Sequence, residues 1–254
     1  MIRDVIMTHT SPTALVTGAN KGIGLAIARQ LGAAGHTVWL GCRDISRGEM
    51  AAFELRENGV DARAVQLDVT DDVSASSAAK TIESEVGHLD VLVNNAGLMF
   101  GSPPSLAEES IDEIQQMFNT NVFGVMRVTQ AFLPLLRKSK AARIVMMSSG
   151  LSSLTDALDM RSETWTVGFG GYCASKTALN MLTVKLAKEL DREGIKVNAV
   201  DPGLTSTDMT GNGPGHSPED GARPAFALAT THAYGPTAGF YACAPSGELV
   251  QKSW

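Results

Sequence analysis

The chain has 254 residues, of which 44% are hydrophobic and 19% are charged, and its formal net charge is −6. This length and composition allow one large globular core. The acidic balance argues against a nucleic-acid surface, which would need a basic patch. The three cysteines, Cys42, Cys173 and Cys243, are far apart, and they match neither a disulfide framework nor the spacing of zinc ligands.

The N-terminal stretch, residues 1–12, lacks the continuous apolar core of a signal peptide. No run of apolar residues approaches the roughly eighteen that a membrane span needs. We therefore expect a soluble, cytoplasmic protein without a membrane partner. No repeat or linker divides the chain, so we expect one domain over residues 1–254, with residues 1–12 as an arm.

The first stretch with a chemical meaning is TGANKGIG, residues 17–24, which follows an apolar strand at 14–17 and opens a helix. Strand, glycine-rich turn and helix form the phosphate-binding start of a dinucleotide fold. Gly18, Gly22 and Gly24 allow the tight turn and let a pyrophosphate approach the backbone. The helix N-terminus adds N–H donors and a favourable dipole.

The end of the second strand, 37–41, bears on the choice of nicotinamide cofactor. A carboxylate there suits the ribose 2′-hydroxyl of NAD, whereas an arginine suits a 2′-phosphate. Arg43, together with Lys21 in the glycine turn, makes two cations near that phosphate. Asp44 has two possible roles: it belongs to an NAD site, or it caps the helix that follows it.

Strands and helices alternate along the rest of the chain, which predicts a parallel sheet with helices on both faces. Ligands then lie beyond the carboxyl ends of the strands, where Asp68, Asn94–Gly97 and Ser149 are found. The expected strands are 14–17, 37–41, 62–67, 89–93, 143–147, 195–200 and 239–244, and the expected helices begin after Gly22 and at 45, 70, 106, 172 and 218.

Tyr172 and Lys176 lie one turn apart on the same face of a helix expected to reach Leu190. A nearby ammonium favours a phenolate and moves the pKa of a tyrosine from near 10 toward the working range. The pair can therefore serve as a tuned acid and base. The alternative is a half-buried tyrosine above a solvated lysine. Asn121, a polar amide in the middle of the apolar helix expected over 106–136, also needs partners.

Seven motifs in order resemble the classical short-chain dehydrogenase/reductases, over roughly residues 13 to 244. KGIGLAIA, Arg43-Asp44, Thr207-Asp208-Met209 and Gly235-Pro236-Thr237 look most like the NADPH-dependent carbonyl reductase branch. The resemblance implies a doubly wound, single-domain Rossmann fold with a seven-stranded parallel sheet. The motifs are TGANKGIG, Asp68-Val69, Asn94-Asn95-Ala96-Gly97, Asn121, Ser149, Tyr172-xxx-Lys176 and Asp201-Pro202-Gly203.

The resemblance also implies roles. Tyr172 is expected to be the general acid in carbonyl reduction and the base in alcohol oxidation. Lys176 is expected to lower the pKa of Tyr172 and to hold the nicotinamide ribose, and Ser149 to donate a hydrogen bond to the substrate oxygen. Asn121 is expected to hold a water that links Lys176 to solvent.

The cofactor implied is NADP(H), and the reaction is the reversible reduction of a ketone or aldehyde. Alternatives are a 3-oxoacyl or hydroxysteroid reductase with the same machinery, or a catalytically silent NADP-binding regulator. The expected cofactor contacts are Gly18, Asn20, Lys21, Gly22, Ile23, Gly24, Arg43, Asp68, Val69, Asn95, Ala96, Gly97, Tyr172, Lys176, Pro202, Gly203 and Thr205.

Three features depart from the family pattern. Asp201 stands where asparagine is more common, Ser148 is an alternative to Ser149, and the interval from Ser149 to Tyr172 is longer than in most members. We expect the extra segment, 150–171, and the loop 204–218 to form the substrate pocket, together with Leu98, Met99 and Phe100. Their apolar character favours a hydrophobic small-molecule substrate.

The extra segment also bears on assembly. Trp165, Val167 and Phe169 can cover helix surface that otherwise pairs with a second copy. We therefore expect a monomer, with a homodimer or homotetramer as the alternatives.

Overall fold

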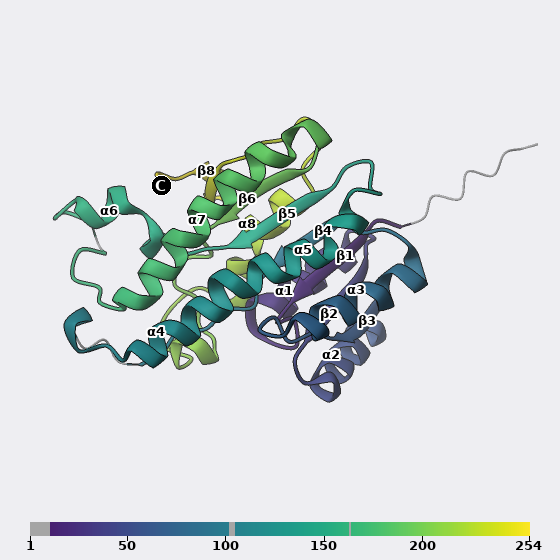
Figure 1. The fold of residues 1–254 in the computed structure, drawn as a ribbon, viewed down its shortest axis with the longest axis horizontal. Coiled ribbons are helices and arrows are strands. Elements are labelled where there is room, and N and C mark those ends of the chain that lie inside the picture. Colours follow the sequence, from purple (N-terminus) through teal and green to yellow (C-terminus); the bar gives the residue numbers. More distant parts are fainter. Residues whose placement is uncertain (1–10, 102–104, 163) are drawn as a thin grey trace, which may run out of the picture.

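The computed structural model describes residues 11–101, 105–162 and 164–254, so that most of the expected N-terminal arm lies outside the described residues. Strands and helices alternate along the chain (Figure 1). The strands are β1 Thr13–Thr17, β2 Thr37–Cys42, β3 Ala62–Gln66, β4 Val91–Asn94, β5 Arg143–Met147, β6 Lys196–Val200, β7 Phe240–Cys243 and β8 Leu249–Gln251. The helices are α1 Gly22–Ala33, α2 Ile45–Glu57, α3 Asp72–Val86, α4 Ile111–Phe118, α5 Val125–Leu136, α6 Leu154–Leu158, α7 Gly170–Leu190 and α8 Pro218–Ala229.

The strands form one sheet in the order β3-β2-β1-β4-β5-β6-β7-β8. The seven expected strands are present and parallel, which confirms the single-domain Rossmann fold, and β8 adds an antiparallel pair with β7 that the sequence did not predict. The order reverses between β1 and β4, which are neighbours in the sheet. In such sheets ligands bind beyond the carboxyl ends of the strands at this reversal.

Alternate residues of the central strands point to opposite faces of the sheet, and each face has its own buried core. Leu15, Leu92 and Ile144 pack with residues of α3, α5 and α7. Val16 and Val93 pack on the other side with residues of α1, α2 and α8. Both faces of a parallel sheet are thus covered, which explains why its strands read as continuous apolar runs. Within the described residues, none of the helices combines the length and apolar character that a membrane span requires.

The helix expected over 106–136 begins at Ile111 rather than at Leu106. Ser110 caps α4 by accepting a hydrogen bond from the Glu113 N–H, and Leu106–Glu108 form a separate short turn. A π-helical turn, Asn119–Gly124, then joins α4 to α5. Such turns inside α-helices frequently occur at functional sites.

The start of α7 is fixed by a carboxylate from the segment before α4. Glu109 Oε2 accepts a hydrogen bond from the Gly171 N–H at 2.7 Å. A Cβ on Gly170 would lie 2.7 Å from Leu106 Cδ1, so the two segments are in close contact. Glu109 therefore sets the position at which Tyr172 enters the site, a role that the sequence analysis missed.

The segment 150–171 holds the short helix α6, at one end of the molecule in Figure 1. Two of its apolar residues, Trp165 and Val167, are themselves 49% and 41% exposed. Phe123 in the π-helical turn and Met181 in α7 remain 57% and 58% exposed. The expectation of a monomer therefore stays a prediction.

Candidate active site

The glycine turn between β1 and α1 has the expected backbone. Gly18 and Gly22 have φ values of 65° and 56°, which glycine adopts at little cost. A Cβ on Gly18 would lie 3.1 Å from Ala96 Cα, and one on Gly24 would lie 2.5 Å from Asn95 Nδ2. Glycine at these positions therefore allows the turn to pack directly on the loop after β4.

The N-terminus of α1 is suited to an anion. Within α1, all of which the structure describes, the first turn holds no acidic residue, and Lys21 at the N-cap makes no side-chain capping bond. By contrast, Asp44 and Asp71 cap α2 and α3. The first N–H groups of α1 are thus available to a pyrophosphate.

Thr17 joins the carboxyl ends of β1 and β4. Its hydroxyl accepts hydrogen bonds from the N–H groups of Asn95 and Ala96, each at 2.9 Å, and its carbonyl accepts one from Asn95 Nδ2 at 2.8 Å. The sequence analysis named Asn95 and Ala96 as cofactor contacts but gave Thr17 no role. Thr17 is the first residue of the glycine motif, and this position is the sequence signal that could have identified its role.

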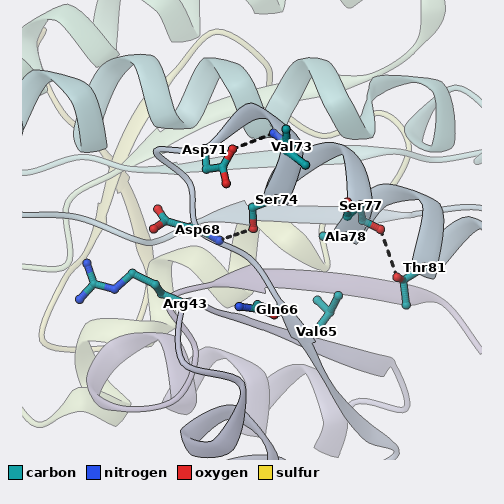
Figure 2. A pocket seen from close by; sticks show the side chains of 10 residues that line it. All are labelled: Arg43, Val65, Gln66, Asp68, Asp71, Val73, Ser74, Ser77, Ala78 and Thr81. Atoms are coloured by element: carbon teal, nitrogen blue, oxygen red, sulfur yellow. Dashed lines mark hydrogen bonds between the residues drawn. The ribbon is translucent and has the colours of Figure 1, made fainter.

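A hollow of about 510 Å³ lies at the ends of β2 and β3 against α3, with Arg43 and Asp68 at one end (Figure 2). Asp68 Oδ1 accepts hydrogen bonds from the N–H and the hydroxyl of Thr70, at 2.9 and 2.7 Å. Burial alone would raise the pKa of Asp68, but these bonds and the charge of Arg43 outweigh it and lower the pKa. A cation and a carboxylate therefore flank the place expected for the adenosine.

Asp44 and Lys21, which the sequence analysis considered for the cofactor site, both have partners within the protein. Asp44 Oδ1 accepts a hydrogen bond from the Arg47 N–H at 3.2 Å, so Asp44 caps α2, one of the two roles considered. Lys21 Nζ lies 2.6 Å from Asp208 Oδ2, in the loop 204–218. Because the two side chains are 58% and 62% exposed, this pair stabilises the fold little, and Lys21 is easily redirected.

Tyr172 and Lys176 lie together on α7 beside the end of β5. Lys176 Nζ is 5.7 Å from the centre of the Tyr172 ring, and it donates a hydrogen bond to the Met147 carbonyl at 2.7 Å. The Ser149 side chain faces that of Tyr172 and favours its phenolate form. The structure thus brings Tyr172, Lys176 and Ser149 together. Asn121 lies close by, because its Oδ1 and Lys176 Nζ would each lie 3.6 Å from a Cβ on Gly97.

Ser148, the alternative to Ser149, faces a different part of the molecule. Its hydroxyl is buried and donates to Asn180 Oδ1 at 2.6 Å. Asn180 Nδ2 in turn donates to Ser152 Oγ at 2.7 Å. Ser148 thus belongs to a structural network that ties β5 to α7, and Ser149 is the serine that faces Tyr172.

Burial disfavours the charged forms of both catalytic side chains. It raises the pKa of Tyr172 to about 12, against the opposite effect of the Ser149 side chain, and the charge of Asp201 raises it further. Burial also lowers the pKa of Lys176 to about 8. The expectation that Lys176 lowers the pKa of Tyr172 is therefore wrong for the protein alone, because desolvation dominates and the ammonium bonds to Met147. Tyr172 holds its proton at neutral pH.

Asn121, which is fully buried, uses its amide to join three segments. Its Oδ1 accepts from the Leu98 N–H at 2.8 Å, and its Nδ2 donates to the Leu98 carbonyl at 2.8 Å and to Ser175 Oγ at 3.0 Å. Both amide hydrogens are thus engaged within the protein. A water held at this position would need the second lone pair of Oδ1 or the main-chain carbonyls of the π-helical turn.

The turn after β6 lies next to Ser149. Asp201 Oδ1 accepts a hydrogen bond from the Gly203 N–H at 3.0 Å, and Thr205 donates to the Gly203 carbonyl at 3.1 Å. Gly203 has a φ of 70°, which favours glycine. A Cβ on Gly150 would lie 2.7 Å from Asp201 Oδ2, so this turn packs directly behind the residue that follows Ser149.

These features follow one another along the carboxyl edge of the sheet, from the hollow at β3 and β2, past the glycine turn at β1, to Tyr172 beside β5 and Gly203 after β6. Gly97, which follows β4, leaves open space midway along this edge, between the glycine turn and Tyr172. A Cβ there would lie 3.6 Å from Lys176 Nζ and 3.7 Å from Met209 Cε. The residues present thus fit an extended dinucleotide with its pyrophosphate at α1.

Comparison with known proteins identifies the family. The model of the short chain dehydrogenase family matches residues 12–215. The chain belongs to the short-chain dehydrogenase/reductase family. This confirms the resemblance seen in the sequence, and it makes the protein an oxidoreductase of a family that uses NAD(P)(H).

Individual members of the short-chain dehydrogenase/reductase family are similar over nearly the whole chain. Short-chain dehydrogenase anuI of Penicillium roqueforti is 37% identical, covering 87% of this chain and 89% of the relative. The structure of salutaridine reductase from Papaver somniferum superimposes with a TM-score of 0.80 at 30% identity, over 90% of this chain and 99% of that one. NADPH-bound carbonyl reductase from chicken fatty liver has a TM-score of 0.81 at 27% identity, over 96% and 99% of the two chains.

Proposed function

We propose that this short-chain dehydrogenase/reductase is an NADPH-dependent reductase of ketones or aldehydes that also oxidises the corresponding alcohols. The observation that carries the proposal is the protonated Tyr172, which the Ser149 side chain faces and beside which Lys176 lies. A proton donor, a fixed dipole and a second titrating group thus lie at one point of the crevice. Salutaridine reductase and carbonyl reductase, two similar proteins, support the reductive direction.

Each side chain has a separate task in carbonyl reduction. When bound, the cofactor supplies the hydride. Tyr172 gives its proton to the carbonyl oxygen, and Ser149 stabilises the negative charge that develops there through a hydrogen bond. Lys176, with a pKa of about 8, titrates near the working pH and so can return a proton to Tyr172.

The proposed preference for NADPH over NADH is based on the residues at the end of β2. Arg43 stands there, while the neighbouring carboxylate of Asp44 is engaged in capping α2. A guanidinium can bind a phosphate through two parallel N–H···O hydrogen bonds, and such charge-assisted bonds are stronger than bonds between neutral groups. Lys21 lies at the start of α1 as a second cation. The residues proposed to hold NADP(H) are those named from the sequence: Gly18, Asn20, Lys21, Gly22, Ile23, Gly24, Arg43, Asp68, Val69, Asn95, Ala96, Gly97, Tyr172, Lys176, Pro202, Gly203 and Thr205.

For the substrate we propose a hydrophobic carbonyl compound. Leu204 and Met209, in the loop 204–218, are 64% and 42% exposed, and Trp165 in the segment 150–171 is 49% exposed. Met209 comes close to Gly97 and so borders the space beside Lys176. Apolar side chains at the entrance favour a ligand with apolar surface to bury.

Assembly and location are further parts of the proposal. Phe123 and Met181 expose apolar surface on the helices around Asn121 and Tyr172, which favours burial against a second copy over the monomer expected from the sequence. Light scattering after size exclusion should therefore give the mass of a dimer or tetramer at micromolar concentration, and a monomer would contradict this. The cytoplasmic location stays a prediction.

The reaction is tested by following NADPH and NADH consumption with aryl ketones, cyclic ketones, 3-oxo esters, 3-oxoacyl thioesters and steroids. We expect turnover with hydrophobic ketones and NADPH. Turnover confined to 3-oxoacyl thioesters or to steroids would favour those narrower reductases. NADPH binding without turnover of any carbonyl compound would indicate a silent NADP-binding regulator.

A further inference from the structure

Residues 249–254 connect the edge of the sheet to the segment beside the active site. After β8, the Lys252 N–H donates to the Phe240 carbonyl at 2.8 Å, and the Trp254 ring stacks on that of Phe240 at 5.6 Å. The Trp254 carbonyl accepts hydrogen bonds from the N–H and hydroxyl of Thr155, at 3.2 and 3.0 Å. This segment is therefore fixed at both ends, against β7 and against α6.

Between these two anchors, Lys252 reaches the turn after β6. Its Nζ lies 2.7 Å from Asp201 Oδ2, and the two side chains are 26% and 11% exposed. A Cβ on Gly150 would lie 2.7 Å from Asp201 Oδ2 and 3.1 Å from Lys252 Nζ. The ion pair thus packs against the backbone immediately after Ser149. The other Asp201 oxygen holds the Gly203 N–H, so one carboxylate links Lys252 to the turn 202–203.

The charge of this carboxylate is felt at Tyr172, where it favours the protonated phenol and so raises the pKa. The groups that face the Tyr172 hydroxyl or act on its charge come from four elements: Ser149 after β5, Lys176 and Cys173 on α7, Asp201 after β6, and Lys252 behind Asp201. Charges in a buried site are weakly screened. A cation directly on Asp201 therefore offsets much of its effect on the phenolate.

We propose that Lys252 is a positioning residue of the catalytic centre, which holds Asp201 and offsets its charge so that Asp201 can fix the turn 202–203 beside Ser149 and Tyr172. The inference rests on the proposed acid/base role of Tyr172. It explains why aspartate is tolerated where the family more often has asparagine: the carboxylate and Lys252 act as a pair.

The test is a double-mutant cycle with Lys252→Met, Asp201→Asn and the combined variant. Two quantities are measured: the pH dependence of alcohol oxidation, and the ultraviolet titration of Tyr172, taken as the difference from the same variant carrying Tyr172→Phe. Lys252→Met should raise the apparent pKa of Tyr172, which should slow oxidation up to about tenfold at a fixed pH below that pKa. Asp201→Asn should shift it in the opposite direction, and the combined variant should return close to the wild type.

Two further variants complete the test. Lys252→Arg keeps the charge and should restore the wild-type titration. Lys138→Met breaks the exposed pair between Lys138 and Glu83, at 2.8 Å, and should change neither measurement. If Lys252→Met does not fold, the inference is still tested by two results. The pKa of Tyr172 should fall in Asp201→Asn, and it should return close to the wild-type value in the combined variant.

An unchanged Tyr172 titration in both single variants would overturn the inference. If the titrations shift as described but no variant, nor the wild type, turns over any carbonyl compound, the proposed function fails while the charge pairing stands. The two proposals are thus separable.

Discussion

The two halves of the crevice are built by different means. On the cofactor side, from β1 to α3, contacts are made by backbone groups and short side chains, such as the close approach of Gly18 to Ala96 and the hydroxyl of Thr17. On the substrate side, ionisable side chains from distant segments meet, as Lys252 and Asp201 do. Substitution on the first side should therefore change cofactor fit, whereas substitution on the second should change proton transfer and charge.

The largest expected effect is on the substrate side. Tyr172→Phe should leave folding and NADPH binding intact while it lowers kcat about a hundred- to ten-thousandfold, because general acid catalysis contributes that much. Steady-state kinetics with a turned-over ketone measure it. Tyr234→Phe, at a side chain that is 94% exposed, is the matched control and should keep full activity. A Tyr172→Phe enzyme with a tenth of the wild-type rate would break the proposed mechanism.

The next largest effect concerns Lys176, whose replacement should change activity and stability in opposite directions. Its pKa is lowered from 10.5 to about 8, so the unfolded chain binds the proton more tightly than the folded one. Below pH 8 the buried charge costs about 3 kcal/mol of stability, and this cost disappears as the pH rises from 8 to 10.5.

Lys176→Met removes that cost but loses the charge-assisted hydrogen bond to the Met147 carbonyl, worth about 1.5–3 kcal/mol. The variant should thus be inactive yet up to about 1.5 kcal/mol more stable at neutral pH, with the gain lost by pH 10.5. Urea unfolding across this range measures it. Lys185→Met, on the exposed side of α7, should show no such pH dependence. A variant less stable than the wild type at neutral pH would contradict the burial argument.

On the cofactor side, Arg43→Leu should raise the KM for NADPH about tenfold or more and hardly change that for NADH. A charge-assisted hydrogen bond of this kind is worth about 1.5–3 kcal/mol. Arg47→Leu, one turn along and exposed, is the control and should leave the ratio of the two cofactors unchanged. If the wild type uses NADH equally well, Arg43 does not set the choice.

The smallest effect lies where the two halves touch. Asp208→Asn removes the ion pair with Lys21 and leaves that cation to a bound 2′-phosphate. Because exposed pairs are worth at most about 1 kcal/mol, NADPH should bind up to about fivefold more tightly at low salt. Fluorescence titration at low and high salt measures it, since screening should remove the gain. Weaker binding at low salt would mean that Asp208 supports the cofactor site.

The sequence predicted the cofactor side better, for a physical reason. Its determinants are local: apolar runs define β1 and β2, and Gly18, Gly22 and Asp44 act within a few residues of their own position. The substrate side depends on pairs such as Asp201 with Lys252, 51 positions apart, which no local pattern reveals. The same holds for Glu109 and Gly171.

Two errors came from reading local patterns too simply. The helix expected from Leu106 starts at Ile111 because Ser110 caps it there, and apolar residues on both sides of that cap concealed the boundary. The pKa of Tyr172 was expected to fall because the spacing to Lys176 is visible in sequence. Burial, which raises it, is a property of the assembled fold.

The strand β8 has a consequence for how the molecule behaves in a crowded solution. An open edge of a parallel sheet can recruit a strand from another chain and so begin aggregation. Here β7 is paired by only three residues of β8, after which Lys252 and Trp254 turn inward to their partners, so little free ladder remains. At the opposite edge, Arg63 of β3 is paired with Asp61 and Glu85. Both edges are thus protected against strand addition, one by a short antiparallel strand and the other by charge.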